Sequence, residues 1–333
     1  MSYRRIVVGV DFSTASLNAV RWVGTRFAPR AQLFLAHVVA RPRVPSFISS
    51  RVNAFDGLDP EEPTLYPGLT GFAAFAGAHR ARVIVRRGQP ADELAALARE
   101  VDADLICVGR SEKRRGTGRF GATTPQRLLA RTRSSVLLVP SAPQLQPTRV
   151  LAAVSDGTEA EGVLHAAAAL AEGWEARVDV LHAVDAETRA LHPSRADAPS
   201  LRQLTEEWLM RRAHQIPRLK SRAMAIGATG DAAEAILTHA ARAHSDLIVM
   251  GRKTFVTPSE NSEGCVGSTT RLITWTTPCP VLVVGAHVPE HPPGERSAPR
   301  RAVTWEHART ANERRIGRRR TDVVFPPDGD GAA

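Results

Sequence analysis

The sequence predicts two tandem α/β domains, each built on a parallel, doubly wound sheet. Three observations carry this prediction: an internal repeat, an alternation of short apolar segments with helix-like segments, and a length of 333 residues, which suits two domains of ordinary size. Continuous apolar segments are typical of strands buried on both faces, and parallel strands need crossover connections between them.

The internal repeat is the strongest of these observations. The segment GATTPQRLLARTRSSVLLVP at 121–140 aligns with VGSTTRLITWTTPCPVLVVG at 266–285 at an offset of 145 positions, which also aligns Asp11 with Asp156. The segments ADLICVGR and SDLIVMGR align at an offset of 142, because repeat 2 is three residues shorter before this point and three longer in the loop after Gly251. A constant offset over so many positions indicates tandem duplication.

Repeat 1 is expected to alternate strands with helices. Ser13 or Thr14 can cap the first helix, and Pro90 suits the first turn of another. Five prolines between positions 41 and 80 predict an irregular surface loop around a short helix at 69–80. The expected strands are 5–11, 32–39, 81–88, 104–109 and 135–139, and the remaining helices follow the first strand or cover 90–102 and 123–131.

Repeat 2 is expected to follow the same order. Its strands are 149–156, 177–184, 221–227, 246–251 and 280–285, and its helices cover about 158–172, 200–214, 231–243 and 267–276. The expected boundaries are domain 1 at 1–143, domain 2 at 144–288, and a basic, mostly disordered tail at 289–333. For the tail the alternative is that its arginine cluster docks onto an acidic partner.

Composition narrows the classes of function. The chain is 43% hydrophobic, and no apolar run reaches the roughly 18 residues that a membrane helix needs. The net charge of +10 would suit nucleic acid, but aromatic residues make up only 5% of the chain, so stacking platforms for single strands are missing. The three cysteines lack metal-ligand spacing, so we expect free thiols and a cytoplasmic protein, with Cys107 in a buried strand.

The candidate ligand-binding groups follow the ends of the expected strands, because ligands of parallel sheets bind beyond the carboxyl ends where the strand order reverses. A glycine lets a phosphate approach the backbone, and the start of a helix offers it N–H groups and hydroxyls. An aspartate after the first strand can accept hydrogen bonds from a ribose or a base. The candidates are Asp11, Val39, Gly109, Arg110, Ala122 and Thr123 in repeat 1, and Asp156, Val184, Gly251, Lys253, Thr254, Gly267, Ser268 and Thr269 in repeat 2.

Each of these groups also has a purely structural interpretation. The aspartates can be helix caps, the strand-end glycines can be turns, and Arg110 and Lys253 can be surface charges. His37 and His182 recur at the same place on an apolar strand. We interpret both histidines as satisfied polar groups near a strand end rather than as ligands.

The chain resembles the universal stress protein family. The resemblance is carried by VVGVDFS and VLAAVSDGTEA, by the strand ends HVV and HAV, by ADLICVG and SDLIVMG, and by GSTTRLITWTTPCPVLVV, and it covers about residues 3–285. It implies two five-stranded, Rossmann-like domains of the adenine nucleotide alpha hydrolase-like kind. It also implies that the fifth strands, 135–139 and 280–284, pair antiparallel to form an intramolecular pseudo-dimer, so that a homodimer would be optional and would use other surfaces.

The family's ATP-binding members carry a motif of Gly, two residues, Gly, nine residues, Gly, then Ser or Thr, and both repeats alter it. Repeat 1 keeps the spacing from Gly109 but has Glu112 and Ala122 at the other two glycine positions, with Thr123 at the hydroxyl position. A carboxylate facing phosphates is unfavourable, although nearby lysine and arginine residues could offset it.

Repeat 2 keeps more of the motif. Gly251, Gly267 and Ser268 are present, while Thr254 replaces the second glycine and the loop is three residues longer. Gly264 could restore part of the lost backbone freedom. Repeat 2 is therefore the better candidate site.

These observations lead to the hypothesis of a stress-response protein that binds an adenine nucleotide, ATP or AMP, with Mg²⁺ as a candidate companion ion. The sequence holds no Walker lysine loop, nucleophile elbow or HExxH motif, so any enzymatic activity would be at most slow ATP hydrolysis. The alternatives are a nucleotide-free scaffold for an unknown protein partner and a nucleic-acid-binding protein. An adenylating enzyme is disfavoured, because a basic or histidine-containing phosphate signature is missing near the first strand.

Overall fold

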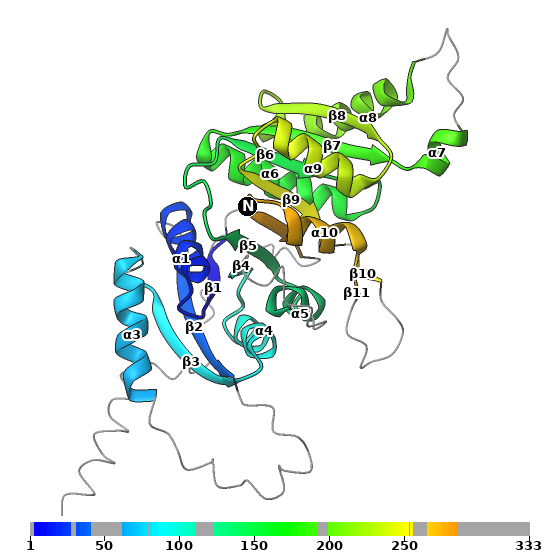
Figure 1. Cartoon of the computed structure of the whole chain (residues 1–333). Coiled ribbons are helices and arrows are strands. Elements are labelled where there is room, and N and C mark those ends of the chain that lie inside the picture. The colour runs from blue at the N-terminus through cyan, green and yellow to red at the C-terminus, as the bar shows by residue number, and fades with distance from the viewer. Residues whose placement is uncertain are drawn as a thin grey trace, which may run out of the picture. The chain divides into compact units, whose positions relative to one another are not determined.

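The computed structural model (Figure 1) describes residues 3–27, 31–40, 62–76, 78, 80–110, 123–191, 199–252, 254–255 and 265–285, and the structural statements below concern these residues. Most of the proline-rich segment of repeat 1 and the whole tail at 289–333 lie outside them. The expectations for the proline-rich loop and for the tail therefore stay predictions.

Repeat 1 contains the predicted alternation of strands and helices. Its elements are β1 (Arg5–Val10), α1 (Thr14–Arg26), β2 (Gln32–Ala40), α3 (Glu62–Phe75), β3 (Arg82–Gly88), α4 (Pro90–Glu100), β4 (Leu105–Arg110), α5 (Thr124–Arg131) and β5 (Ser135–Pro140). Helix α3 is longer than the short helix expected at 69–80. It begins near Pro63, and the first turn of a helix tolerates proline because its N–H groups have no intrahelical partner.

Repeat 2 follows the same order of strands and helices. Its elements are β6 (Arg149–Ala153), α6 (Glu159–Trp174), β7 (Arg177–Val184), α7 (Ala186–Leu191), α8 (Leu201–Gln215), the 3₁₀ turn η3 (Pro217–Leu219), β8 (Ala223–Thr229), α9 (Ala232–Arg242), β9 (Leu247–Gly251), β10 (Thr254–Phe255), β11 (Cys265–Val266), α10 (Ser268–Thr276) and β12 (Val281–Val284). The sequence did not predict α7 or η3, nor that β10 and β11 pair antiparallel at the base of the long loop after β9.

All the described strands except the β10–β11 pair form one ten-stranded sheet in the order β3-β2-β1-β4-β5-β12-β9-β6-β7-β8. Strands pair in parallel within each repeat, whereas β5 and β12 pair antiparallel, with Leu137 directly opposite Leu282. The predicted pairing of the fifth strands is thus confirmed, and it makes one chain an intramolecular pseudo-dimer. We call the β5–β12 pair the seam.

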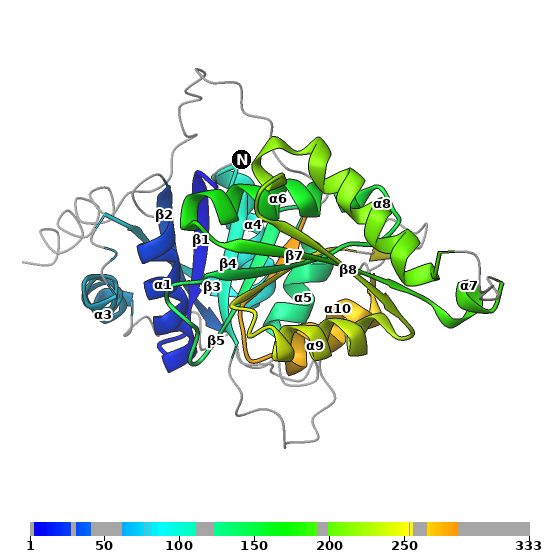
Figure 2. The same ribbon diagram turned by 90° about the horizontal axis from the view of Figure 1, so that it is seen from above.

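Helices cover both faces of this sheet (Figure 2). Side chains from α1, α3, α6 and α8 join one apolar cluster, and side chains from α4, α5, α9 and α10 join the other. Successive strand residues alternate between the two clusters, as Ile6 and Val7 do. Cys107 is fully buried on β4, as predicted, and burial raises the pKa of its thiol.

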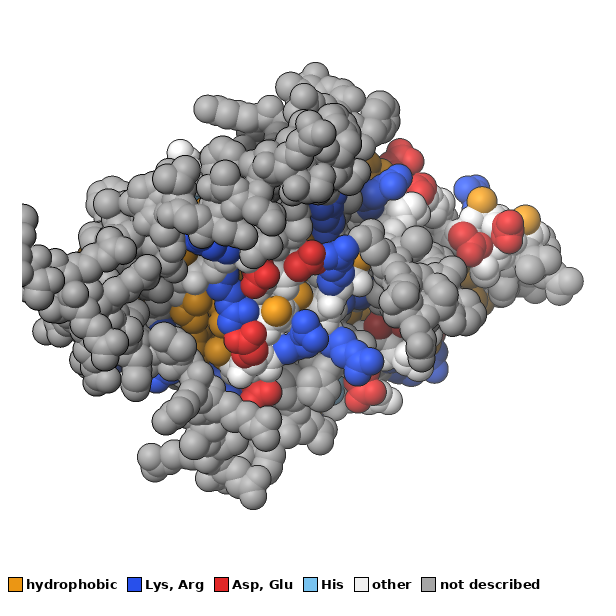
Figure 3. All heavy atoms as spheres, turned by 90° about the horizontal axis from the view of Figure 1, so that it is seen from below, with side chains coloured by type: hydrophobic (Ala, Val, Ile, Leu, Met, Phe, Trp, Pro, Cys, Tyr) orange, Lys and Arg blue, Asp and Glu red, His pale blue; other side chains and the backbone are white. Residues whose placement is uncertain are grey.

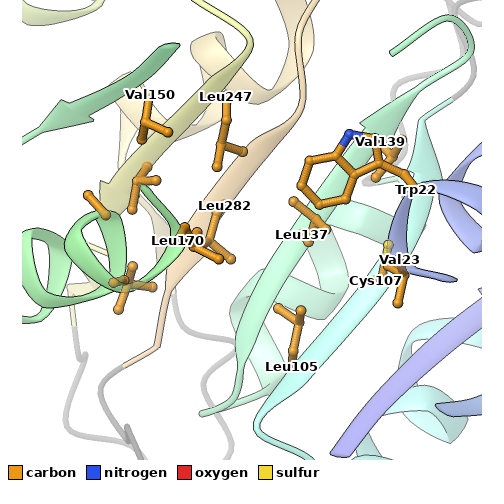
Figure 4. Packing of buried hydrophobic residues seen from close by; sticks show 14 of the residues in the cluster. Trp22, Val23, Leu105, Cys107, Leu137, Val139, Val150, Leu170, Leu247 and Leu282 are labelled. Carbon is orange, nitrogen blue, oxygen red and sulfur yellow. The ribbon is translucent and has the colours of Figure 1, made fainter. Parts of the chain in front are cut away.

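An aromatic contact also joins the repeats on the sheet face where Trp22 lies in the same apolar cluster as Leu137 and Leu282 of the seam (Figure 4). Trp22 of α1 is fully buried, and its ring meets the ring of Trp174, at the end of α6, edge to face at 5.4 Å between centroids. The Trp22 indole Nε1 donates a 3.0 Å hydrogen bond to the carbonyl of Gln144, which lies in the segment joining the repeats. Contacts on the sheet face therefore add to the strand pairing that joins the repeats.

The aspartate of the ADL and SDL motifs has a structural role in both repeats. Asp104 accepts hydrogen bonds from the N–H groups of Arg4, at 2.7 Å, and Arg5, at 3.2 Å. Asp246 accepts them from the N–H groups of Thr148, at 2.7 Å, and Arg149, at 3.0 Å. Each carboxylate thus holds the start of the first strand of its repeat. This role is structural and does not require a ligand.

Candidate functional site

Ligands of parallel sheets bind where the strand order reverses, and each repeat has one such reversal, which we call its crevice. The order reverses between β1 and β4 in repeat 1 and between β6 and β9 in repeat 2, so each crevice lies at the carboxyl ends of those strands. Asp11 and Gly109 lie at the first crevice, and Asp156 and Gly251 lie at the second. Val39 and Val184 lie at the ends of the neighbouring strands β2 and β7, as predicted.

Asp11 is held in a tight turn at the end of β1. Its Oδ1 accepts a 2.5 Å hydrogen bond from the Ser13 hydroxyl and a 3.1 Å bond from the Ser13 N–H. Burial raises the pKa of this carboxyl, but hydrogen bonds from Ser13 and Ser16 outweigh it, and the net result is a lowered pKa. The Ser13 oxygen in turn accepts from the N–H of Ser16, which confirms Ser13 as the cap of α1.

Phe12, which the sequence analysis did not single out, dominates the surface beside this turn. Its φ of 59° is unusual for a bulky residue, and 42% of the residue is exposed. The ring lies 4.9 Å from the ring of His37 on β2 and 5.7 Å from the ring of Phe72 on α3. Phe12 therefore fills space between β2 and α3 in repeat 1, where repeat 2 has the aligned Gly157.

Repeat 2 has a carboxylate in its crevice. Glu159, the first residue of α6, packs so tightly on Gly251 that a Cβ added there would lie 2.7 Å from the Glu159 Cγ. The Glu159 Oε1 accepts a 2.9 Å hydrogen bond from the Ser155 hydroxyl. Glu159 aligns with Thr14 of repeat 1, so the sequence places a carboxylate where repeat 1 has a hydroxyl. Glu159 was not among the predicted site residues, although this difference could have indicated it.

The glycines that end the fourth strands are needed for packing. A Cβ at Gly109 would lie 2.5 Å from the backbone of Ala15 and Ser16, where α1 crosses the end of β4. At Gly251 the neighbour is instead the Glu159 side chain. The crevice of repeat 1 is therefore bounded by the helix backbone, and the crevice of repeat 2 by an acidic side chain.

The two helices that precede the fifth strands begin differently. In α5 the N-cap is Thr123, whose N–H donates a 3.1 Å hydrogen bond to the Gln126 side chain, and Pro125 in the first turn has no N–H. In α10 the N-cap is Gly267, and no side chain caps the helix. Ser268, Thr269 and Thr270 follow, so the first turn of α10 keeps its backbone donors.

Of the predicted loop residues of the site, Thr254 is described and lies near the start of α10. Strand β10 pairs Thr254 with Val266, which brings Thr254 beside Gly267 and Ser268. Lys253 and Ala122 lie outside the described residues.

Arg110 donates hydrogen bonds from Nη1 to the carbonyl of Thr274, at 2.7 Å, and from Nη2 to the carbonyl of Thr277, both in repeat 2. Its guanidinium is thus engaged between the repeats. Arg110 therefore bonds backbone carbonyls of repeat 2 and is left out of the proposed phosphate site.

The repeated histidines confirm their structural interpretation. The Nδ1 atom of His37 lies 2.7 Å from the carbonyl of Val10, and that of His182 lies 2.9 Å from the carbonyl of Val154. Because a carbonyl can only accept, Nδ1 is the donor in both pairs. Each histidine ties the end of the second strand to the end of the first.

Among the described residues there is no cluster of three or more His, Cys, Asp or Glu that could hold a metal ion, and no helix there is long and apolar enough to cross a membrane. On the described part of the face in Figure 3, positive and negative side chains lie interspersed rather than in a basic stripe.

Comparisons with solved structures agree with this fold. A universal stress protein from Archaeoglobus fulgidus matches with a TM-score of 0.61 and 17% identity, and the alignment covers 86% of this chain and 100% of that one. A putative universal stress protein from Pseudomonas aeruginosa matches with a TM-score of 0.51 and 15% identity, over 85% and 93% of the two chains. At these identities the similarity concerns the fold alone.

A further match is described as a universal stress protein in complex with cAMP. It is 26% identical over 43% of this chain and 100% of its own, with a TM-score of 0.33. The cAMP is a property of that protein. No curated protein matches the chain.

The family comparison covers both repeats. The universal stress protein family matches residues 2–140 and again residues 147–285, which together span most of the chain. The two matches coincide with the two halves of the sheet that meet at the seam. The chain therefore belongs to the universal stress protein family, as a member with two tandem domains.

Proposed function

We propose that this protein acts in a stress response by binding an adenine nucleotide, ATP or AMP, in repeat 2 in preference to repeat 1. The observation that carries the preference is the difference between the starts of α10 and α5. The first turn of α10 keeps the N–H groups of Ser268, Thr269 and Thr270, whereas α5 has lost one donor to Pro125 and uses another for Gln126.

The surroundings of α10 support a phosphate at this end of the helix. Gly267 has a φ of −55°, which any residue can adopt. A glycine at this position therefore matters because it lacks a side chain and not because of its backbone conformation. Without a Cβ, the backbone before Ser268 can be approached closely by an anion. The partial positive charge at the N-terminus of α10 also attracts a phosphate. In α5 this attraction would be weaker, because fewer free N–H groups contribute to it.

Glu159 opposes a bare phosphate in the same repeat, because like charges repel across a partly buried crevice. A divalent cation would change the sign of this contribution, since Mg²⁺ is commonly held by one or two carboxylates together with phosphate oxygens. We therefore propose that repeat 2 binds nucleotide together with Mg²⁺, and that Glu159 faces the ion. The remaining predicted residues, Asp156 and Val184, would lie toward the ribose and the base.

Titration calorimetry with ATP and AMP, each with and without Mg²⁺, tests the proposal directly. The variant Gly267→Val places a branched side chain at the phosphate approach and should weaken ATP binding about tenfold or more. The aligned variant Ala122→Val in repeat 1 is the matched control and should leave the affinity unchanged.

Mass spectrometry of any ligand released from freshly purified protein would identify the nucleotide. If the wild-type chain gives neither heat with millimolar nucleotide nor a released nucleotide, the scaffold hypothesis replaces this one. If Ala122→Val weakens binding and Gly267→Val does not, the preference for repeat 2 is wrong.

A further inference from the structure

Two aligned arginines cross the seam in opposite directions. Arg110 follows the glycine that ends β4, and Arg252 follows the glycine that ends β9, at the 142-residue offset of the fourth strands. Arg110 donates to the carbonyls of Thr274 and Thr277 in repeat 2. Arg252 donates from Nη2 to the carbonyl of Ser134 at 3.2 Å and from Nη1 to the carbonyl of Thr132, both in repeat 1.

One acceptor of each arginine is also aligned. Thr132 is the C-cap of α5 and Thr277 is the C-cap of α10, and they are related by the 145-residue offset. The last carbonyls of a helix lack intrahelical partners and carry its partial negative charge, so a guanidinium satisfies them and stabilises that end. We call the pair Arg110 and Arg252, with these carbonyls, the arginine clamp.

The clamp lies in a partly buried environment where its loss would be costly. Arg252 is only partly exposed, and desolvation lowers its pKa to about 10, which still leaves it protonated at neutral pH. A guanidinium can bond two carbonyls in fixed geometry, which a lysine ammonium does less well. Removing either arginine would leave helix-end carbonyls of the other repeat without these partners.

The clamp reaches both pieces of the proposed nucleotide site. Arg252 starts the loop that leads through β10 and β11 to Gly267, and β11 itself contacts α5 of repeat 1. Arg110 holds the C-terminal end of α10, whose N-terminal end is the proposed phosphate site. The loop and the helix of the repeat 2 site are thus both anchored on repeat 1.

We propose that Arg110 and Arg252 are positioning residues for the nucleotide site of repeat 2, so that repeat 1 supports that site across the seam. The inference rests on the proposed function for its ligand, and it gives repeat 1 a role although its own motif is degenerate. Because coupling between two equilibria is reciprocal, nucleotide bound in repeat 2 would in turn stabilise the seam.

The test compares Arg110→Met, Arg252→Met and the two corresponding lysine variants with Arg242→Met, a control on the exposed end of α9. Circular dichroism first establishes that each variant is folded. Calorimetry with Mg²⁺ and ATP then gives the affinity. Hydrogen exchange of the ligand-free chain is followed at the Arg271 N–H, which donates a 3.0 Å hydrogen bond to the carbonyl of Gly267 and so reports the first turn of α10. The arginines do not make this bond, so exchange there reports coupling and not the loss of the clamp bonds themselves.

We expect the methionine variants to bind ATP about tenfold more weakly than wild type and to exchange faster at the Arg271 N–H, with the lysine variants between. The control should change neither quantity. Folded clamp variants with wild-type affinity and wild-type exchange would overturn the inference. If the methionine variants do not fold, the lysine variants carry the same two readouts.

The two proposals fail in different ways. If the wild-type chain binds no nucleotide, the proposed function fails, and exchange at α10 in the ligand-free chain still decides whether the clamp positions that helix. Faster exchange in the clamp variants would then support the positioning role, and unchanged exchange would overturn it.

Discussion

At the end of repeat 1, α5 begins with Pro125 and with Gln126, whose side chain bonds the helix's own backbone, while the aligned α10 begins with Gly267 and a run of Ser and Thr. The first strands differ as well. Repeat 1 follows β1 with the strained, partly exposed Phe12, and repeat 2 follows β6 with Gly157 and the acidic Glu159. The two copies have therefore diverged where a ligand would lie.

Other contacts have been kept in both copies. The aspartates that hold the first strands and the histidines that tie strand ends together occupy aligned positions and bond equivalent backbone atoms. The arginines of the clamp are aligned too, and each bonds the C-cap carbonyl of the last helix of the other repeat. These contacts position strands or join the repeats, so they are needed whether or not a ligand is bound. A duplicated chain can therefore keep the contacts that hold its fold in both copies while the residues at the ligand crevices diverge.

The largest expected effect tests the shared architecture. Leu137 and Leu282 are each 1% exposed and lie directly opposite each other on β5 and β12. Leu137→Asp and Leu282→Asp would each bury an unpaired charge, and we expect each to lower the free energy of unfolding by about 4 kcal/mol or more. Urea unfolding measures the loss, and small-angle scattering follows separation of the repeats.

Leu272→Asp on the exposed face of α10 is the control for this prediction, since Leu272 is 46% exposed. The pseudo-symmetry requires the two seam variants to behave alike. Seam variants that keep the wild-type stability and radius of gyration would refute the structure of the seam, and a large difference between them would refute its symmetry.

The next largest effect concerns Asp104 and Asp246, which have the same structural role but differ in burial. Asp104→Ala would leave the N–H groups of Arg4 and Arg5 without their acceptor in a place where Asp104 is only 7% exposed, and Asp246→Ala would do the same at a more open position. We expect losses of about 2 kcal/mol for Asp104→Ala and about 1 kcal/mol for Asp246→Ala. Thermal or chemical unfolding of both variants measures them, and the reverse order would contradict the burial argument.

Much of the fold could be predicted from the sequence because it depends on local patterns that occur twice. The strand segments are apolar, the helices carry caps such as Ser13, and the seam strands match the family pattern. The pair β10–β11 and the helix α7 could not be predicted, because two residues per strand and six residues per helix give too little periodicity to detect.

The candidate site was predicted less well, because side-chain direction depends on distant neighbours. Arg110 follows a strand-end glycine and so suggested a phosphate contact, but its partners are carbonyls 164 and 167 residues away in the chain. Glu159 was visible as an acidic residue at a helix start. Its position against Gly251 depends on how α6 crosses β9, which no local pattern gives.

A smaller effect sharpens the ligand side of the comparison. Glu159→Gln removes the negative charge from the crevice of repeat 2 while keeping a side chain that can accept from Ser155. Without Mg²⁺ we expect ATP to bind about fivefold more tightly than to wild type, and with Mg²⁺ the gain should vanish or reverse. Thr14→Ser at the aligned position of repeat 1 should change neither affinity. An Mg²⁺-independent gain would mean that Glu159 does not face the ion.

The smallest expected effect concerns acid stability in repeat 1. Because the folded pKa of Asp11 is lowered, its stabilising contribution is present above the unfolded value of about 3.9 and is lost as the pH falls through the folded value. Asp11→Asn should therefore flatten the dependence of unfolding free energy on pH below about pH 4, at a cost at pH 7 of less than about 1 kcal/mol, since solvent screens this exposed turn.

Asp156→Asn in repeat 2 is the matched control, because its exposed side chain makes no hydrogen bond among the described residues. Urea unfolding between about pH 2.5 and 7 measures both. An unchanged curve for Asp11→Asn would show that the bonds from Ser13 do not favour the charged form.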